Sequence, residues 1–382
     1  MSLSITIIGV GRLGLCMSLC FASKNYKVTG IDANEDYIDS LNKNTFISIE
    51  NDVNKMLDQY RDNIFFTTDI SCALSTDIIF IVVPTPTLDN DEYDHSIINN
   101  IVNQLITFGY QEKPINLVIS STTMPGYCND IYNKLKEYNY EVCYNPEFIA
   151  QGTIIRDMLS PDITLIGECV PESKCADMII QVYSKVLVKF IDYVDDIDIH
   201  HLPLNYMNIQ RMSLIEAEIV KISINCFITT KIAFANMIGD ALIANGYNPE
   251  KALNAIGNDK RIGTHNLKWG FGYGGPCFPR DNRALAKFLS NNGLYNNICK
   301  ATDDANGLHL YQQIKEFEKA HPDKNQVIEI NQVAYKKDTE ILDESQQLKF
   351  AIKLSKKGYK VKITENDKIR HKIQEIYDGF VP

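Results

Sequence analysis

Residues 4–14 read SITIIGVGRLG, an apolar run that leads directly into a GxGxxG glycine pattern. The apolar run predicts a buried strand over residues 4–11, and a helix pattern follows the glycines. A second apolar strand, residues 26–31, ends in Asp32. Glycines allow a tight turn and a close backbone approach to phosphate, and an acid after the second strand suits ribose hydroxyls. The stretch therefore predicts a dinucleotide-binding domain, and Asp32, rather than a base, favours NAD over NADP.

Three more apolar strands are predicted in the first half of the chain, at residues 78–83, 116–120 and 140–144. They are followed by the loops PTP (84–86), STT (121–123) and NPEF (145–148). In a doubly wound sheet, ligands collect at the carboxyl ends of the strands, so these loops are expected to face the cofactor. For Thr85 and Thr122, plain turn chemistry is the alternative. The pattern predicts an α/β fold with a Rossmann-like N-terminal domain.

Length and composition describe an ordinary globular protein. The 382 residues suit more than one domain, and we expect three, at residues 1–205, 206–318 and 325–382. The net charge of -10 argues against a nucleic-acid surface, and no apolar run approaches a membrane span. The ten cysteines show no CxxC pair, so no metal site is expected, and unpaired cysteines favour a reducing, cytoplasmic location.

A long helix is predicted over residues 213–244, and on it Glu218, Lys221 and Asn225 share one face. A Glu–Lys pair on a helix is usually a solvated surface pair. Here the neighbouring side chains are apolar all round, which favours burial. A buried lysine with an asparagine one turn further on is a candidate clamp for a developing oxygen charge.

The stretch GFGYGGPCFPRD, residues 270–281, combines four glycines, two prolines and one thiol. Glycine lets the backbone approach a ligand closely, and Pro276 and Pro279 stiffen the exit. A thiol presented in this way at Cys277 suits nucleophilic attack on a carbonyl. The alternative is a Gly/Pro turn with a buried structural cysteine.

Beyond this loop, helix is predicted to about residue 310, and a polar linker lies near residues 320–325. The remainder reads as a short α/β unit with two strands and two helices. The elements predicted there are a strand at 326–331, a helix at 345–357, a strand at 359–364 and a helix at 369–377.

Taken together, these motifs make the chain resemble the UDP-glucose/GDP-mannose 6-dehydrogenase family of nucleotide-sugar dehydrogenases. The motifs are GVGRLG with Asp32, VPTP at 83–86, STT at 121–123, NPEF at 145–148, EAEIVKISINCF at 216–227, RIG at 261–263, GYGGPCFPRD at 272–281 and AYKKDT at 334–339. The resemblance implies an N-terminal Rossmann-like NAD domain, a central helical region that forms a homodimer, and a C-terminal α/β domain that binds nucleotide sugar. That last domain is expected to be shortened here.

The resemblance also implies a four-electron oxidation, in which UDP-glucose, two NAD and one water give UDP-glucuronate. Cys277 would add to the aldehyde to form a thiohemiacetal and then a thioester. Lys221, helped by Asn225, would hold the oxygen charge, and Asp281 would orient or deprotonate the hydrolytic water. Glu147 would act as the general acid/base.

Thr122 would complete the catalytic set by fixing a water or the sugar. The cofactor residues implied by the match are Gly9, Gly11, Arg12, Leu13, Gly14, Asp32, Pro84, Thr85, Pro86, Ser121, Thr122 and Gln151. The substrate residues implied are Glu147, Phe148, Ile149, Gln151, Lys221, Asn225, Arg261, Lys268, Gly270, Phe271, Gly272, Tyr273, Gly274 and Lys336. Arg261 is expected to reach the site of a neighbouring subunit.

The chain departs from the family pattern at several positions. Gln151 stands where an acid is common, and Asp343 stands where an NAD-binding arginine is common. Tyr37 replaces a cofactor-contacting arginine, Pro276 a serine beside the thiol, and Asn266 an aromatic residue.

Three alternatives remain open at this point. The same chemistry could act on UDP-N-acetylhexosamine, UDP-galactose or GDP-mannose. A two-electron hydroxyacid dehydrogenase would also pair a Rossmann domain with a helical one, but it needs no nucleophilic cysteine. A non-catalytic nucleotide-sugar binder would agree with the departures at Gln151 and Asp343.

Overall fold

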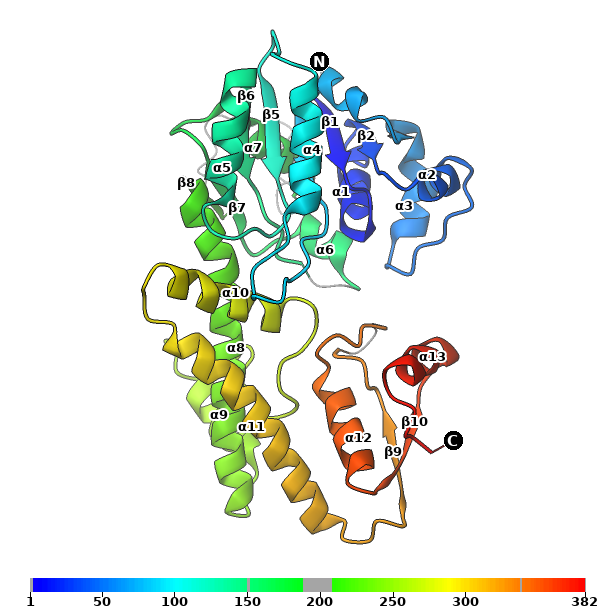
Figure 1. The fold of residues 1–382 in the computed structure, drawn as a ribbon, viewed down its shortest axis with the longest axis vertical. Helices are drawn as coiled ribbons and strands as arrows, with labels where there is room; N and C mark the ends of the chain where they lie inside the picture. Colours follow the sequence, from blue (N-terminus) through cyan, green and yellow to red (C-terminus); the bar gives the residue numbers. More distant parts are fainter. Residues whose placement is uncertain (1–2, 150–151, 188–207, 337–338, 382) are drawn as a thin grey trace. The chain divides into compact units, whose positions relative to one another are not determined.

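Figure 1 shows the fold of the chain in a computed structural model. The structure describes residues 3–149, 152–187, 208–336 and 339–381. The chain packs as two compact units, of which the first ends at Lys221 and the second begins at Ile222. The division expected near residue 205 stays a prediction.

The first unit is built on one eight-stranded sheet. Its strands are β1 (Ser4–Ile8), β2 (Lys27–Ile31), β3 (Ile64–Thr67), β4 (Ile78–Ile81), β5 (Ile115–Ile119), β6 (Tyr140–Tyr144), β7 (Thr164–Glu168) and β8 (Ile209–Ser213). Their order in the sheet is β3-β2-β1-β4-β5-β6-β7-β8. The strands from β3 to β6 pair in parallel, β7 pairs antiparallel with β6, and β8 is parallel to β7. The predicted Rossmann-like sheet is therefore present, with β3, β7 and β8 added to the strands that the sequence predicted.

Helices cover both faces of this sheet. They are α1 (Arg12–Ala22), α2 (Glu35–Asn42), α3 (Val53–Tyr60), α4 (Ser96–Thr107), α5 (Tyr127–Leu135), α6 (Ile154–Leu159), α7 (Lys174–Val186) and the first turns of α8 (Leu214–Ala244). In Figure 1, α4 and α5 lie in front of the sheet and α7 lies behind it.

Side chains alternate between the two cores along each strand. On β4, Ile78 and Phe80 join the core beside α1 and α7, whereas Ile79 and Ile81 join the core beside α4 and α5. Because both faces are covered, the strands read as continuous apolar runs rather than as alternating ones.

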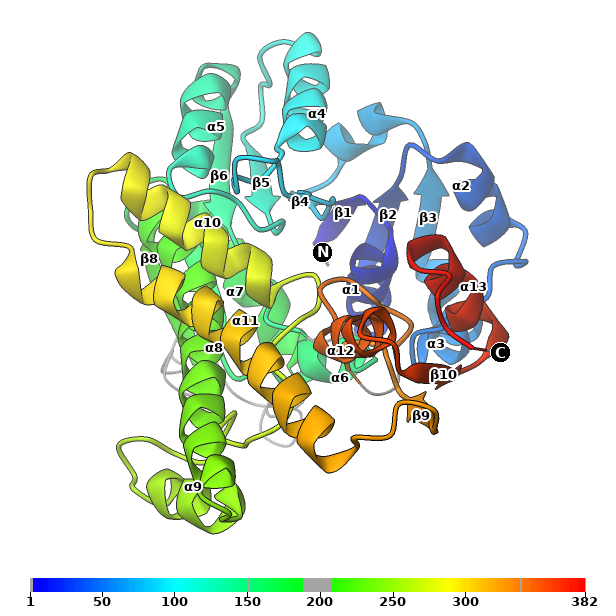
Figure 2. The same cartoon turned by 60° about the horizontal axis from the view of Figure 1, so that its bottom comes forward.

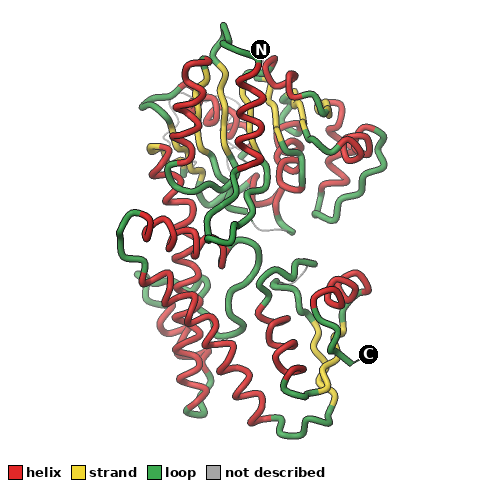
Figure 3. Tube along the Cα trace, viewed as in Figure 1, coloured by secondary structure: helices red, strands yellow, loops and turns green. Residues whose placement is uncertain are grey.

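The second unit contains the rest of α8 and the C-terminal α/β segment. Its further elements are α9 (Pro249–Gly257), α10 (Phe278–Asn291), α11 (Asn297–Ala320), β9 (Val327–Asn331), α12 (Gln346–Lys356), β10 (Lys360–Thr364) and α13 (Asp367–Ile376). Figure 2 shows α10 beside α11, and Figure 3 shows that helix dominates this unit apart from the β9–β10 pair. The two strands pair in parallel, and the core beneath them includes Leu310 and Ile314 of α11.

Two expectations about the helices need correction. The single helix predicted from residue 282 to about 310 is two helices, because Gly293 adopts a left-handed φ of 66° in the turn between α10 and α11. By length and composition α8 is apolar enough to cross a membrane, contrary to the expectation that no run approaches such a span. Two charged side chains of α8, Glu218 and Lys221, are nevertheless buried and hydrogen-bonded to the first unit, as in the core helix of a folded domain.

Candidate active site

The glycine turn between β1 and α1 has the shape that a dinucleotide needs. A methyl group on Gly9, which has a φ of 93°, would lie 2.4 Å from the carbonyl oxygen of Val82. One on Gly14 would lie 2.0 Å from the carbonyl oxygen of Gly9. Gly11 precedes α1 with open space above it and no side chain capping the helix. The backbone amides of the turn and of the first turn of α1 therefore stay accessible to a pyrophosphate.

The acid after β2 is held at the edge of this turn. The backbone N–H of Asp32 donates to the carbonyl oxygen of Thr67, and its Oδ1 accepts from the N–H of Asn34. The hydroxyl of Tyr37 donates to the carbonyl oxygen of Val10 at 2.8 Å, so Tyr37 stabilises the backbone of the glycine turn. The other predicted residues of this region are Arg12, Pro84 and Pro86, which are exposed, and Leu13, which is half-buried.

The loops after β4 and β5 are bound to each other. Ser121 Oγ accepts from the N–H of Val83 at 3.0 Å and donates to its carbonyl oxygen at 2.7 Å. Thr85 is buried, and its hydroxyl donates to the carbonyl oxygen of Thr122 at 2.8 Å. Thr85 and Thr122 therefore follow the strand ends, as predicted, and the hydrogen bond between them also stabilises the two loops, as expected for turn residues.

Glu218 of α8 ties that helix to the loop after β5. Its carboxylate is fully buried and accepts bonds from Thr123 Oγ1 (2.8 Å) and from the N–H groups of Gly126 (2.6 Å) and Cys128 (2.9 Å). Burial raises the pKa of Glu218 above its ordinary value, and these hydrogen bonds oppose that rise. The same helix face holds Lys221, so the burial predicted for this pair is confirmed.

Lys221 is brought to the loop after β6. Its Nζ donates to the carbonyl oxygen of Glu147 at 2.5 Å and lies 4.2 Å from the ring centre of Phe148. The residue is 7% exposed, so its ammonium is largely shielded from water. A shielded cation acts more strongly on a nearby developing negative charge than an exposed one does.

The carboxylate of Glu147 turns toward α7. The hydroxyl of Tyr183 donates to Glu147 Oε1 at 2.5 Å. Burial raises the pKa of Glu147, while the Tyr183 bond and the Lys221 charge lower it. A carboxyl with a raised pKa is suited to exchange protons near neutral pH. Tyr183 lies 36 residues beyond Glu147, and sequence reasoning missed it because no local pattern joins them.

In the second unit, Asn225 and Asp281 meet beside the cysteine loop. Asn225 Nδ2 donates to Asp281 Oδ2 at 2.7 Å, and the Asp281 side chain is 1% exposed. The N–H of Asp281 donates to the carbonyl oxygen of Cys277, which caps the start of α10. Cys277 is exposed, which favours the nucleophile over the buried structural cysteine. Thiolates are favoured at helix N-termini.

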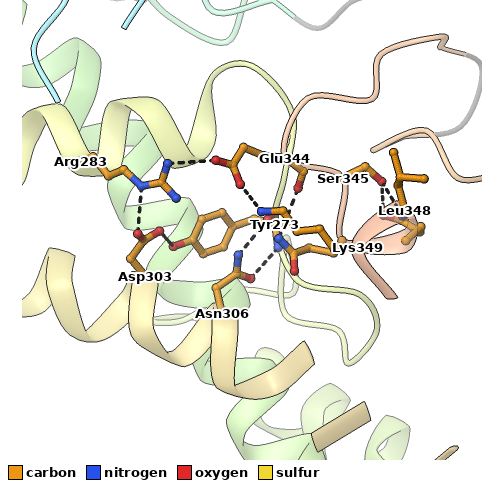
Figure 4. Close-up of polar contacts among 10 residues, drawn as sticks. Tyr273, Arg283, Asp303, Asn306, Glu344, Ser345, Leu348 and Lys349 are labelled. Carbon is orange, nitrogen blue, oxygen red and sulfur yellow. Dashed lines mark hydrogen bonds and ion pairs between the residues drawn. The ribbon is translucent and has the colours of Figure 1, made fainter. Parts of the chain in front are cut away.

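The glycine loop before Cys277 is held by a polar network (Figure 4). Asn306 of α11 accepts from the N–H of Tyr273 and donates to its carbonyl oxygen, at 3.0 and 2.9 Å. The Tyr273 hydroxyl donates to Asp303, which also pairs with Arg283 at 3.0 Å. Arg283 in turn pairs with Glu344 at 3.0 Å, so the network reaches the segment before α12.

The next glycines leave no room for side chains. A methyl group on Gly274 would lie 2.5 Å from the carbonyl oxygen of Glu344, and one on Gly275 would lie 2.5 Å from the ring of Tyr335. The N–H of Gly275 donates to the carbonyl oxygen of Asp343 at 2.9 Å. Asp343 therefore supports the loop through its backbone carbonyl.

The remaining predicted substrate residues lie at the surface or outside the described part. Arg261 is exposed and pairs with Asp259 of its own chain at 2.7 Å. Lys268, Phe271 and Lys336 are exposed, and Ile149 is half-buried. Gln151 lies outside the described residues. Among the residues that the structure describes, no group of three or more His, Cys, Asp or Glu side chains could hold a metal.

The dinucleotide turn between β1 and α1, with an acid after β2, is the nucleotide-binding arrangement of a dehydrogenase. Residues 3–187 match the model of the NAD-binding domain of the UDP-glucose/GDP-mannose dehydrogenase family, and residues 215–307 match that of its central domain. The chain therefore belongs to the UDP-glucose/GDP-mannose dehydrogenase family, whose members are NAD-dependent nucleotide-sugar dehydrogenases. The predicted family, fold and cofactor are confirmed.

Individual relatives show how far the similarity extends. The chain is 31% identical over 309 residues to UDP-glucose 6-dehydrogenase of Rickettsia bellii, which covers 80% of this chain and 67% of that protein. It is 26% identical over 378 residues to GDP-mannose 6-dehydrogenase of Pseudomonas aeruginosa, and that match covers 95% of this chain and 81% of that protein. The solved structure of the UDP-glucose dehydrogenase of Pyrobaculum islandicum superposes on this chain with a TM-score of 0.85 at 24% identity. The superposition covers 100% of this chain and 86% of the other, so the two share a fold. The chain spans about two thirds of the length of the UDP-glucose 6-dehydrogenases it matches.

Proposed function

We propose that this chain oxidises the C6 alcohol of UDP-glucose to the carboxylate, with UDP-glucuronate as the product. The observation that carries this proposal is the hydrogen bond of 2.7 Å between Asn225 and the buried carboxylate of Asp281. It supports the proposal because Asp281 lies one helical turn after the exposed Cys277, to whose carbonyl oxygen its N–H donates. We favour UDP-glucose over other nucleotide sugars because the Rickettsia relatives of this chain are named UDP-glucose 6-dehydrogenase.

The cofactor site fits NAD, because the turn at Gly9, Gly11 and Gly14 leaves its backbone open and Asp32 follows β2. NAD bound there would accept a hydride from the sugar carbon in each of two oxidations. The residues of the chain would hold the charges and protons of the other steps.

The covalent step belongs to Cys277. Its thiolate adds to the C6 aldehyde, which gives a thiohemiacetal, and loss of a hydride from that carbon leaves a thioester. Water then attacks the thioester carbonyl, releasing the carboxylate and the thiol. Lys221 and Asn225 stabilise the oxygen charge that develops in the addition steps. Asp281 orients or deprotonates the water, and Glu147 accepts the alcohol proton. In balance, one alcohol, two NAD and one water give one carboxylate, two NADH and three protons.

The test is NADH absorbance with UDP-glucose, UDP-N-acetylglucosamine, UDP-galactose and GDP-mannose assayed in parallel. We expect UDP-glucose to give the highest kcat/KM and two NADH per sugar. Cys277→Ser should lose turnover, whereas the matched buried-thiol variant Cys16→Ser should keep the stoichiometry. One NADH per sugar, with an aldehyde or ketone as the final product, would refute the proposal. Binding of the sugar without any NADH would instead identify a non-catalytic binder.

We also propose that the chain forms a homodimer through α8. Three apolar side chains on one face of this helix support it, because Phe227, Phe234 and Met237 are 68, 43 and 55% exposed. Light scattering after gel filtration tests this. Phe234→Glu should convert a dimer into a monomer, while Ile376→Glu, at an exposed apolar position of α13, should not. A wild-type monomer at micromolar concentration would contradict the proposal.

A cytoplasmic location is the third part of the proposal. It is supported by the ten cysteines, all of them in the described residues, which form no disulfide. Cell fractionation checks it, and recovery of the protein outside the cytoplasm would contradict it.

A further inference from the structure

Two helices of the second unit, α8 and α11, lie against each other through small side chains (Figure 1). The hydroxyls of Thr230 on α8 and Thr302 on α11 are 3.1 Å apart. One turn earlier on each helix stand Cys226 and Cys299, and their two thiols hydrogen-bond to each other. The two helices therefore bring one cysteine each to the same contact.

A pair of buried thiols is usually plain packing, and the first unit contains a pair of this kind. Cys143 of β6 and Cys175 of α7 also hydrogen-bond to each other, and both are 0% exposed. Burial raises the pKa of Cys175 well above its ordinary value, so this thiol stays protonated and unreactive. Contact between two thiols is therefore not enough to make them react.

Cys299 differs because its thiol is acidic. Its pKa lies below the ordinary value, since Cys226 donates a hydrogen bond to it, and this effect exceeds the opposing effect of burial. Cys299 is also the third residue of α11, a helix of 24 residues, and helix N-termini favour thiolates. The same hydrogen bond raises the pKa of Cys226. The pair therefore joins a thiol that ionises first to a neighbour that keeps its proton.

The contact between these two thiols also lies close to the surface. Cys226 is 5% and Cys299 6% exposed, and Ile298, the neighbour of Cys299, is 72% exposed. A small opening of the first turn of α11 is enough to admit a molecule of the size of hydrogen peroxide, because the ends of helices open locally at low cost.

The thiol pair borders residues of the proposed catalytic set. Cys226 follows Asn225 directly, and its thiol donates to the backbone carbonyl of Asp281 at 3.4 Å. Asn282 Nδ2 donates to the carbonyl oxygen of Cys299 at 2.8 Å, so the start of α10 is bound to both cysteines. A bond between the two sulfurs would remove the Cys226 hydrogen and draw its sulfur toward α11. The hydrogen bond between Asn225 and Asp281 would then lose this support.

We propose that Cys226 and Cys299 form a reversible disulfide when hydrogen peroxide is present, and that this oxidation weakens the binding of the nucleotide sugar. The disulfide is independent of the proposed function, whereas its effect on the sugar rests on it.

The oxidation has two steps. The Cys299 thiolate attacks one oxygen of the peroxide, the O–O bond breaks, and hydroxide leaves and takes up the proton that Cys299 had lost, which gives a sulfenic acid. The sulfur of Cys226 then attacks the sulfur of Cys299, the S–O bond breaks, and water leaves with the Cys226 proton. In balance, two thiols and one hydrogen peroxide give one disulfide and two waters.

Mass spectrometry of tryptic peptides tests for the disulfide. Cys277→Ser is the background, because the exposed Cys277 thiol would otherwise react with the peroxide. Trypsin leaves Cys226 in residues 222–231 and Cys299 in residues 288–300, each as the one cysteine of its peptide. We expect peroxide to link these two peptides and dithiothreitol to separate them, while Cys143 and Cys175 stay reduced as the matched control. Absence of the linked peptide would overturn the proposal.

Dimedone, which labels sulfenic acids, tests the order of attack. In Cys226→Ser, made in the same background, Cys299 should be labelled, because no thiol is left to displace the oxygen. In Cys299→Ser, Cys226 should stay unlabelled, because its thiol keeps its proton. Equal labelling of the two cysteines would overturn the assignment of Cys299 as the attacking thiol.

Calorimetry of UDP-glucose binding measures the consequence for the site. In Cys277→Ser the Kd should rise about fivefold on oxidation, as for the loss of one hydrogen bond, and should return with dithiothreitol. The double variant with Cys226→Ser should keep its Kd in peroxide. An unchanged Kd in fully linked protein would overturn the effect on the sugar. If UDP-glucose does not bind at all, the proposed function fails, while the peptide link still decides whether the disulfide forms.

Discussion

At Gly239 the effect of one added methyl group can be worked out from the contacts around it. In Gly239→Ala the new methyl would lie 2.1, 2.5 and 2.8 Å from three atoms of Trp269, so the indole must move. Its N–H bond to Asp240, now 2.9 Å, would then be lost. The perturbation is therefore a clash together with a broken hydrogen bond to a carboxylate.

The expected change in the free energy of unfolding has three contributions, two destabilising and one stabilising. Overpacking costs about 1–3 kcal/mol, and loss of a hydrogen bond to a charged group costs about 1.5–3 kcal/mol. Replacing a helical glycine by alanine returns about 1 kcal/mol. We expect a net loss of about 1.5–5 kcal/mol in the free energy of unfolding of the second unit, which corresponds to a fall in Tm of about 5–15 °C.

The assay combines calorimetry with the emission of the single tryptophan, Trp269. Gly307→Ala on α11 is the matched control, because a methyl group there meets no atom within 4 Å. It should gain about 0.5–1 kcal/mol through helix propensity alone and leave the emission unchanged. If Gly239→Ala were as stable as Gly307→Ala and kept the wild-type emission, the packing of Trp269 against α8 would be refuted.

Three further predictions concern the first unit. Tyr183→Phe removes a bond that lowers the pKa of Glu147, so that pKa should rise and the acid limb of the kcat profile should move to higher pH; an unmoved limb would contradict the role of Tyr183. Burial holds the pKa of Glu147 in the folded state above its value in the unfolded state. The folded protein therefore binds this proton more tightly, and the free energy of unfolding should increase as pH falls from the folded-state pKa to the unfolded-state pKa. Urea denaturation at several pH values measures this change. Thr123→Val should lower the free energy of unfolding by about 1–3 kcal/mol, because it removes a hydroxyl donor from the buried Glu218 carboxylate; chemical denaturation with unchanged stability would contradict it.

The nucleotide turn could be predicted from sequence because its signals are local. The glycine pattern, the apolar strand before it and Asp32 after the next strand lie within one short stretch, and each has a direct backbone consequence. The burial of Glu218 and Lys221 was also readable, since their helical neighbours are apolar on all sides. Gly293 was a signal for the break between α10 and α11, but the helical pattern on both sides of it led to the prediction of continuous helix.

Contacts that depend on distant packing could not be predicted. Tyr183 reaches Glu147 only because α7 folds behind the sheet. The contact between Cys226 and Cys299 requires α8 and α11 to lie side by side, and no local pattern joins the two residues. The reversal of direction at β7, which pairs antiparallel with β6, could not be predicted either, because the apolar pattern of a strand carries no signal for its direction in the sheet.

The contacts of Gly274 with Glu344 and of Gly275 with Tyr335 also constrain how this protein can diverge. A larger residue at position 275 would need a smaller residue than Tyr335 and would still be strained, because Gly275 has a φ of 83°. A larger residue at position 274 would need a shift of the chain path at Glu344. Substitutions in these two distant stretches should therefore appear together or not at all when many related sequences are compared.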